Sequence, residues 1–189
     1  MIKYEKKILF SKKEYNYLMQ LNTGYHNSYY QVNYYYDSDM YELDKLDITC
    51  RIREHNRSYK AAIKAHQNKE SECSIEHSTM VLNEFDSKLF DQMNIKIQGY
   101  TITFRSTLLF CDKLKVRFDR NYYLNTEDYE MEIEYDLAFA QQANKLLGFF
   151  AEALHKLDET ISPKEFCDRA NNYSSKSHRF FDRKKSLIN

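Results

Sequence analysis

A short segment near residue 130 alternates acidic and apolar side chains, and this alternation strongly limits how the chain can fold. Glu130, Glu132 and Glu134 are separated by Met131 and Ile133. Side chains in a β-strand point alternately to opposite faces, so an extended segment places the three carboxylates on one face and the apolar pair on the other. The sequence therefore predicts a strand with one acidic face.

Basic residues follow the same two-residue spacing in the segment just before it. Lys115 and Arg117 alternate with apolar residues, and Arg51 and Arg53 are also two positions apart. Like charges on one face repel each other unless a group of opposite charge lies between them. Phosphate oxygens can separate Arg and Lys side chains, and a divalent cation can separate carboxylates. The pattern therefore indicates a sheet face that binds polyphosphate and metal together.

The rest of the chain predicts an α+β protein with about eight mostly antiparallel strands. Alternation and aromatic or β-branched content predict strands at 2–10, 29–37, 48–54, 58–66, 70–80, 100–111, 114–120 and 129–136. Cap signals and helical spacing predict helices from Ser11, over 84–92 after Asn83, over 138–157 and from Ser162, followed by a basic tail from 174 to 189 that ends irregularly. We expect an eight-stranded antiparallel closed β-barrel flanked by helices, with a helical C-terminal region. If its charged faces point outward the barrel is an ordinary one, and if they point inward it has a polar bore.

Composition limits the partners. Lys plus Arg and Asp plus Glu both number 28, so no overall field favours nucleic acid or an anionic membrane. The N-terminus lacks the apolar run of a signal peptide, and no stretch approaches the roughly 20 apolar residues of a membrane span. The four cysteines are far apart and lack zinc-site spacing. We expect a cytoplasmic protein whose anion site comes from local segregation of charge.

The order of these charged pairs resembles the CYTH family, the triphosphate tunnel metalloenzymes, and within it the short bacterial members of Firmicutes type. The resemblance covers nearly the whole chain and depends on the ordered set: Glu5-x-Lys7, Tyr35-Tyr36-Asp37, Arg51-x-Arg53, Ile63-Lys64, Lys115-x-Arg117 and Glu130-x-Glu132-x-Glu134. It implies a single domain over 1–189, in which 1–136 supply mainly the tunnel strands and 137–189 supply helices that pack on the barrel and cap it.

The resemblance also implies roles for individual residues. The triphosphate ligands would be Lys7, Arg51, Arg53, Lys64, Arg105, Lys115, Arg117, Lys176 and Arg179, of which Lys176 and Arg179 would close one end of the tunnel. Glu5, Glu132 and Glu134 would hold Mg²⁺ or Mn²⁺. Glu130, as the residue that orients the attacking water, and Lys7 would be catalytic.

One position departs from the family pattern. The first Glu of the family's E-x-E-x-K signature is Lys3 in this chain. This replacement removes a hard oxygen ligand and adds a positive charge, and both changes oppose binding of a divalent cation.

Three functions remain open from the sequence. The first is a metal-dependent hydrolase of inorganic or organic triphosphates, a phosphoric anhydride hydrolase. The second is an adenylyl cyclase of the class IV type, and the third is a polyphosphate- or nucleotide-binding protein without catalysis. The expected partner is a small molecule such as tripolyphosphate, a nucleoside triphosphate or thiamine triphosphate, without nucleic acid or membrane, and a homodimer is an open option. The basic tail could be a nucleic-acid patch, although a helix end or tunnel lid is favoured.

Overall fold

The computed structural model describes residues 2–21, 27–66, 73–170 and 174–188, and the side chains of these except 2, 3, 66, 73–79, 109 and 110. Within them the strands are β1 (Ile2–Phe10), β2 (Asn27–Asp37), β3 (Ile48–His55), β4 (Ser58–His66), β5 (Cys73–Leu82), β6 (Lys96–Cys111), β7 (Leu114–Tyr123) and β8 (Thr126–Tyr135). The helices are α1 (Lys12–Leu21), α2 (Glu42–Lys45), α3 (Ala140–Leu157), α4 (Pro163–Arg169) and α5 (Lys176–Ile188), with short 3₁₀ turns η1 (Asp91–Met93) and η2 (Leu137–Phe139).

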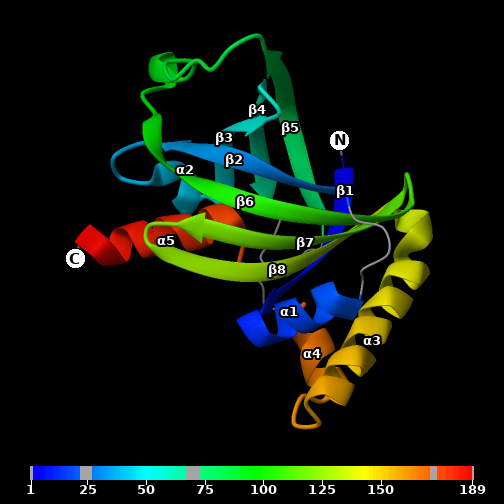
Figure 1. Cartoon of the computed structure of the whole chain (residues 1–189). Helices are drawn as coiled ribbons and strands as arrows, with labels where there is room; N and C mark the ends of the chain where they lie inside the picture. Colours follow the sequence, from blue (N-terminus) through cyan, green and yellow to red (C-terminus); the bar gives the residue numbers. More distant parts are fainter. Residues whose placement is uncertain (1, 22–26, 67–72, 171–173, 189) are drawn as a thin grey trace.

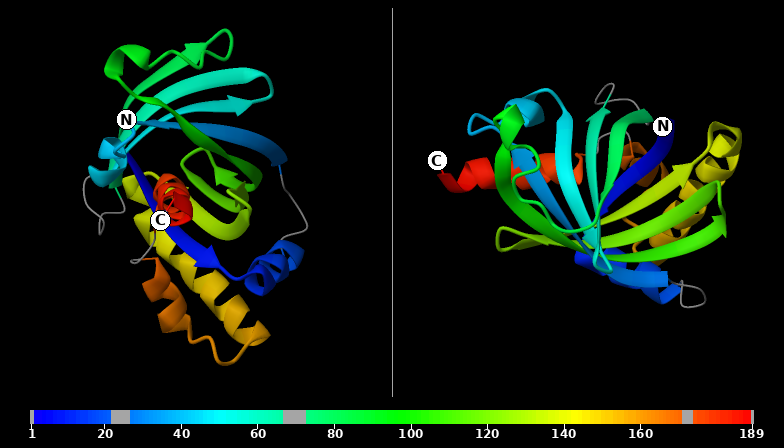
Figure 2. Two further views of the ribbon diagram at one scale, coloured as in Figure 1. Left: turned by 90° about the vertical axis from the view of Figure 1, so that its left-hand side faces the viewer. Right: turned by 90° about the horizontal axis from the view of Figure 1, so that it is seen from above.

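The described strands form a closed antiparallel barrel in the order β1-β5-β4-β3-β2-β6-β7-β8 (Figures 1 and 2). β1 closes the ring, because it pairs with β8 from Tyr4 to Phe10 and with β5 over the short stretch from Ile2 to Tyr4. The α+β class and the eight-stranded barrel predicted from the sequence are confirmed.

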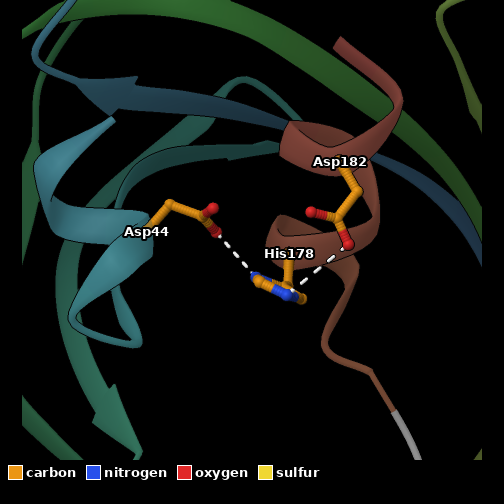
Figure 3. Close-up of side chains that lie close together, drawn as sticks. All are labelled: Asp44, His178 and Asp182. Carbon is orange, nitrogen blue, oxygen red and sulfur yellow. Dashed lines mark hydrogen bonds and ion pairs between the residues drawn. The ribbon is translucent and has the colours of Figure 1, made fainter. Parts of the chain in front are cut away.

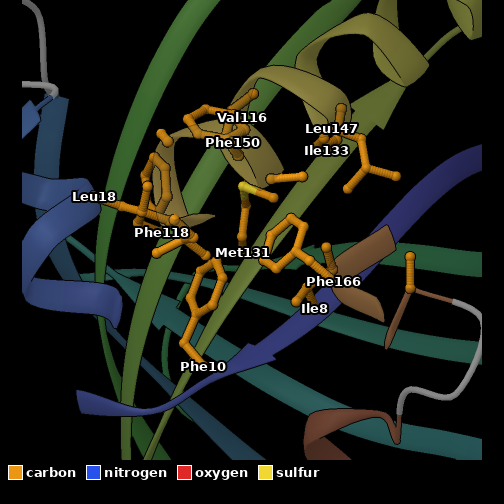
Figure 4. Close-up of a cluster of buried hydrophobic side chains, with 14 of the residues drawn as sticks. Ile8, Phe10, Leu18, Val116, Phe118, Met131, Ile133, Leu147, Phe150 and Phe166 are labelled. Carbon is orange, nitrogen blue, oxygen red and sulfur yellow. The ribbon is translucent and has the colours of Figure 1, made fainter. Parts of the chain in front are cut away.

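The apolar faces of β1, β7 and β8 point outward and are covered by helices. Ile8, Val116, Phe118, Met131 and Ile133 are all buried in one cluster with side chains of α1, α3 and α4 (Figure 4). Since successive side chains alternate, the charged residues of the same strands must face the interior. The apolar cover on the outside therefore determines that the bore is polar.

Two predicted helix starts are confirmed by their cap geometry. The backbone N–H of Ser11 donates to Glu14 Oε2 at 2.7 Å, and the N–H of Glu14 donates to Ser11 Oγ at 3.3 Å, which is the predicted capping box of α1. Ser162 Oγ accepts from the N–H of Glu165 at 3.0 Å, with Pro163 in the first turn of α4.

The helix predicted over 84–92 is wrong. The segment forms bends and turns that end in η1. Phe85, Leu89 and Phe90 instead pack with Ile52 and Tyr36 on the outer face of the barrel. Closely spaced aromatic anchors on a strongly curved sheet favour a turn-rich path over one regular helix.

The basic tail, for which a helix end or a tunnel lid was favoured, contains helix α5, which lies within the ring of strands at one end of the barrel (Figure 2). Ser175 caps its start, because Ser175 Oγ accepts from the N–H of His178 at 3.2 Å. Phe180 and Phe181 are buried against Tyr35 on the inward face of β2. Ser177, Phe180 and Phe181 show helical spacing that the sequence analysis did not use.

One glycine makes close approach of α5 to the wall of the barrel possible. Gly99 on β6 has a φ of +150°, next to an irregularity in the β2–β6 pairing at Tyr35 and Tyr36. A Cβ at this position would lie 2.6 Å from Cζ of the Phe180 ring. Only glycine fits both the backbone conformation and the space.

We predict that Gly99→Ala destabilises the protein by about 1–3 kcal/mol, because the added methyl group overlaps the buried Phe180 ring and strains the backbone. Gly148→Ala in α3 is the control, since a Cβ there would have no atom within 4 Å and alanine favours helix by about 0.5–1 kcal/mol. Urea unfolding measures both variants. Equal stability of the two variants would contradict the docking of α5 described above.

Candidate functional site

Three buried carboxylates meet on the inner face of β7 and β8. Asp119 lies opposite Glu130 in the register, and Glu132 is two residues further along β8. One oxygen from each of the three lies within 4.8 Å of the others. Asp119 is 0% exposed and Glu130 is 1% exposed, so their repulsion is not relieved by bulk water. This acidic trio is a concentrated group of buried negative charge in the bore.

The Lys176 ammonium group from α5 lies among the acidic trio. Its Nζ is 2.7 Å from Asp119 Oδ2 and 3.2 Å from Glu132 Oε1, and it also donates to Glu130 Oε1. Burial lowers the pKa of Lys176, but Asp119, Glu130 and Glu132 outweigh it, so the pKa is raised above its usual value. Lys176 therefore holds a permanent positive charge at the centre of the trio.

Guanidinium groups complete the neutralisation of the trio. Arg105 donates from Nε and Nη2 to the two oxygens of Asp119 at 2.7 and 2.5 Å, and from Nη2 to Glu132 Oε2 at 2.7 Å. Arg179 of α5 pairs with Glu130 at 2.5 Å and with Asp128 at 2.8 Å. Burial disfavours the charged form of Glu132, yet Lys176 and Arg105 hold its pKa well below its usual range.

A second group of ion pairs lies on β1, β4, β7 and β8. Glu5 Oε1 accepts from Lys7 Nζ and from Lys64 Nζ, each at 2.7 Å. Arg117 Nη1 donates to Glu134 Oε2 at 2.8 Å. Burial raises the pKa of Glu5, but Lys7 and Lys64 reverse this and lower it well below its usual value.

The inner face of β3 differs from the acidic side. Arg51 and Arg53 have no carboxylate within ion-pair distance in the described part of the chain, and Lys115 on β7 also has none. Arg53 donates from Nε to Asn33 Oδ1 at 2.9 Å. Burial, together with the nearby positive charges of Arg51 and Arg105, lowers the pKa of Arg53 to about 9. Among the described residues, no carboxylate neutralises these three cations at close range.

The predicted triphosphate ligands of the strands lie on inward faces of the barrel, and Lys176 and Arg179 belong to α5 and pair with β7 and β8. Figure 1 shows the position of α5 beside these strands. The predicted metal ligands are divided between two groups: Glu132 lies in the trio, whereas Glu5 pairs with lysines and Glu134 with Arg117. Sequence reasoning missed Asp119, although it shares the parity of Lys115 and Arg117 on β7. The side chain of Lys3 lies outside the described residues.

α5 is also fixed at its outer side, where His178 lies between two aspartates (Figure 3). His178 Nδ1 is 3.0 Å from Asp44 Oδ1, and its Nε2 is 3.5 Å from Asp182 Oδ2. The three residues lie close enough to hold a metal ion, but Lys185 Nζ already contacts Asp44 Oδ2 at 2.7 Å. Lys184 donates to Gln98 Oε1 at 2.7 Å. These cations of the tail therefore anchor α5, which argues against a nucleic-acid patch.

Comparison with known proteins agrees with this architecture. The family model of the CYTH domain matches residues 1–163. The chain belongs to the CYTH family. No curated protein sequence matches it. The CYTH assignment therefore rests on the family model and on the fold.

Solved structures with the same fold have low sequence identity to this CYTH protein. A candidate adenylate cyclase from Bacillus halodurans is 21% identical, with a TM-score of 0.64 over 95% of this chain and 97% of that one. HpAC1 from Hippeastrum, a candidate adenylyl cyclase described as having a dominant triphosphatase activity, is 16% identical with a TM-score of 0.66 over 96% and 95%. A candidate adenylate cyclase from Vibrio parahaemolyticus is 13% identical, with a TM-score of 0.61 over 96% and 98%.

The TM-scores establish a shared fold, and the activities are those of the other proteins. In the described residues, we find no helix with the length and apolar character needed to cross a bilayer.

Lys64 makes the stability of the protein depend on pH. Burial and the charge of Lys7 lower its pKa to about 8, although Glu5 opposes the shift. The unfolded chain keeps this proton to about pH 10, so between pH 8 and 10 it binds more protons than the folded protein, and stability rises with pH. The stability gained from the deprotonation of Lys64 is fully present above about pH 10 and is lost as the pH falls through about 8.

We therefore expect the free energy of unfolding of the wild type to rise between about pH 8 and 10. Compared with Lys64→Met, the rise should be on the order of 1 kcal/mol per pH unit. Urea unfolding at several pH values measures this difference. Lys60→Met, at an exposed position of the same strand, should follow the wild-type curve. Parallel curves for the wild type and Lys64→Met would contradict the burial of this charge.

Proposed function

We propose that this CYTH protein is a cytoplasmic metal-dependent hydrolase that binds the triphosphate group of a small molecule inside its barrel. The observation that carries the proposal is the segregation of charge in the bore. In the described part of the chain Arg51 and Arg53 on β3 have no carboxylate partner, whereas one oxygen from each residue of the acidic trio on β7 and β8 lies within 4.8 Å of the others. A polyphosphate with a bound divalent cation would match both these arginines and the acidic trio.

The cationic side supports the binding half of the proposal. Guanidinium groups bind phosphoryl oxygens with two parallel hydrogen bonds, which suits Arg51 and Arg53. Lys115 adds a third cation without a described carboxylate partner. A bound triphosphate would relieve the repulsion that these cations exert on each other.

The acidic trio fits a divalent metal in its chemistry. Carboxylate oxygens are the ligands that Mg²⁺ and Mn²⁺ prefer, and Asp119, Glu130 and Glu132 offer three of them in one place. Such an ion, when bound, would neutralise developing charge on the scissile phosphoryl group. Arg105 orients Asp119 and Glu132 through three hydrogen bonds. In this proposal Glu130 orients the attacking water, and Lys7 binds phosphoryl oxygens beside Glu5.

A second candidate function is favoured by Lys176. Its ammonium group lies where the trio would hold a metal, so a permanent positive charge can replace the ion. Lys3, at the position of a carboxylate in the family signature, would act in the same direction. The protein would then bind polyphosphate without hydrolysing it.

Tripolyphosphate should raise the melting temperature more than sulfate at equal ionic strength. Mass action predicts about 2.7 kcal/mol of stabilisation at a hundredfold excess over the dissociation constant. Arg51→Gln should reduce this shift, because it removes a cation without a carboxylate partner. Arg120→Gln, which removes a partly exposed arginine paired with Glu127, should leave the shift unchanged. No preference of the wild type for tripolyphosphate would overturn the binding half.

The hydrolase and the non-catalytic binder are separated by Lys176→Met. Removing the ammonium group leaves three buried carboxylates without their central cation, so the variant should be less stable in EDTA. Mg²⁺ or Mn²⁺ should then stabilise the variant more than the wild type in thermal melting. If neither ion stabilises wild type or variant, the metal-dependent proposal is wrong.

Product analysis separates hydrolysis from cyclisation. With ATP and either metal ion, a hydrolase releases phosphate or pyrophosphate with ADP or AMP, whereas a cyclase yields cyclic AMP with pyrophosphate. We expect hydrolysis, and Glu132→Gln should lower its rate at least tenfold, because it weakens the trio. A wild type that binds tripolyphosphate but turns over neither substrate with either metal would support the binder.

A further inference from the structure

Four polar side chains on one wall of the bore carry buried atoms without a hydrogen-bond partner. The residues are Gln31, Asn33 and Tyr35 on β2 and Thr101 on β6, and the atoms are Nε2, Nδ2, the phenol OH and Oγ1. Each residue is at most 3% exposed. Buried polar groups are nearly always paired, because an unpaired one costs free energy. Four such atoms on one wall therefore indicate a binding surface.

The strand register places these residues beside each other and beside the β3 arginines. Asn33 lies opposite Thr101 on one side and opposite Arg53 on the other. Tyr35 lies opposite Arg51, and Gln31 is two residues along β2 from Asn33. Directly opposed residues have Cβ atoms about 5 Å apart, so the groups can contact one ligand. We call Gln31, Asn33, Tyr35, Thr101 and Arg53 the donor wall.

Hydrogen bonding fixes the polarity of the donor wall at Arg53 and Asn33. Arg53 Nε donates to Asn33 Oδ1 at 2.9 Å, which leaves the amide NH₂ of Asn33 as a free donor. The Nη atoms of Arg53 have no acceptor in the described chain. The Gln31 amide nitrogen donates only, and both hydroxyl groups can donate. The natural ligand for such a wall is a group that only accepts.

The acidic residues of the bore do not supply that acceptor. Glu130 and Glu132 are already paired with cations from α5 and β6. The pKa of Arg53 is lowered to about 9, because burial and the positive charges of Arg51 and Arg105 outweigh the opposing effect of Glu132. An oxyanion bound at the donor wall would supply both the missing acceptor and the missing charge.

We propose that the donor wall binds the terminal phosphoryl group of the substrate and selects for ligands in which that group is free. This inference rests on the proposed function, because it assumes that a polyphosphate enters the bore. A terminal phosphoryl group has three non-bridging oxygens, and an internal one has two. The terminal group therefore offers more acceptor oxygens than an internal one. This larger number suits the several donors of the donor wall.

Two threonines on the inner face of β6 provide a matched test. Thr101 Oγ1 has no partner, whereas Thr103 Oγ1 donates to Asn121 Oδ1 at 2.7 Å, and both residues are at most 1% exposed. Thr→Val at either position keeps the shape and removes the hydroxyl group. Calorimetric titration with tripolyphosphate in EDTA measures affinity, and thermal melting without ligand measures stability.

Thr101→Val should weaken tripolyphosphate binding roughly tenfold, because it removes a hydrogen bond to a charged oxygen, and should not lower the melting temperature. Thr103→Val should lower the melting temperature and keep the affinity within about twofold. Asn33→Asp is a second variant of the donor wall. It keeps the oxygen that Arg53 contacts but replaces a donor by a negative acceptor, so it should weaken binding at least tenfold.

Trimetaphosphate, a cyclic triphosphate without a terminal phosphoryl group, tests the selection. Thr101→Val should change its affinity less than twofold. Equal losses for the linear and cyclic ligands would overturn selection of the terminal group. Unchanged tripolyphosphate binding in both Thr101→Val and Asn33→Asp would overturn the donor wall and leave the proposed function intact. If the wild type does not bind tripolyphosphate, the proposed function itself fails.

Discussion

The compensation of buried charge in the bore is the constraint on which the rest of the structure depends. Asp119, Glu130 and Glu132 could not share one small region without cations among them, because unpaired buried charges are very costly. Lys176 and Arg179 arrive from the far end of the sequence to supply two of these cations. The docking of α5 and the ionised state of the trio therefore depend on each other.

The outer surface of the barrel is stabilised mainly by apolar packing. Apolar side chains of β1, β7 and β8 are covered by α1, α3 and α4, and this burial supplies the hydrophobic stabilisation that a polar interior cannot. On the opposite side, Phe85 and Phe90 cover β2, β3 and β4. The inside is thus free to carry charges, with one side rich in carboxylates and the other in donors without acceptors. That asymmetry distinguishes a ligand-binding bore from a salt-bridged core.

α5 connects the two sides of the bore. Lys176 reaches the acidic trio, while Phe180 and Phe181 pack on Tyr35, which belongs to the donor wall. His178 and Lys185 fix the same helix to Asp44 (Figure 3). A ligand that changes the charge of the trio therefore acts directly on the docking of α5. Through α5, binding of a ligand at the acidic trio is linked to the packing of Phe180 and Phe181 beside the donor wall.

The sequence by itself determined the strands, because side-chain alternation is a local property of an extended chain. It left open whether the charges point inward or outward, and the helices that cover the apolar faces of β1, β7 and β8 decided this. It did not determine which carboxylates meet, because the trio depends on the β7–β8 register, which places Asp119 opposite Glu130 and Glu134 opposite Lys115. Glu134 pairs with Arg117 and is not part of the trio. The bounds and docking of helix α5 were not fixed by the sequence for a related reason, since the acidic partners that hold Lys176 lie 44 or more residues away along the chain. Only the closed barrel brings Lys176 to Glu130 and leaves Asn33 and Thr101 without acceptors, because these contacts exist only between strands and helices that are distant along the chain.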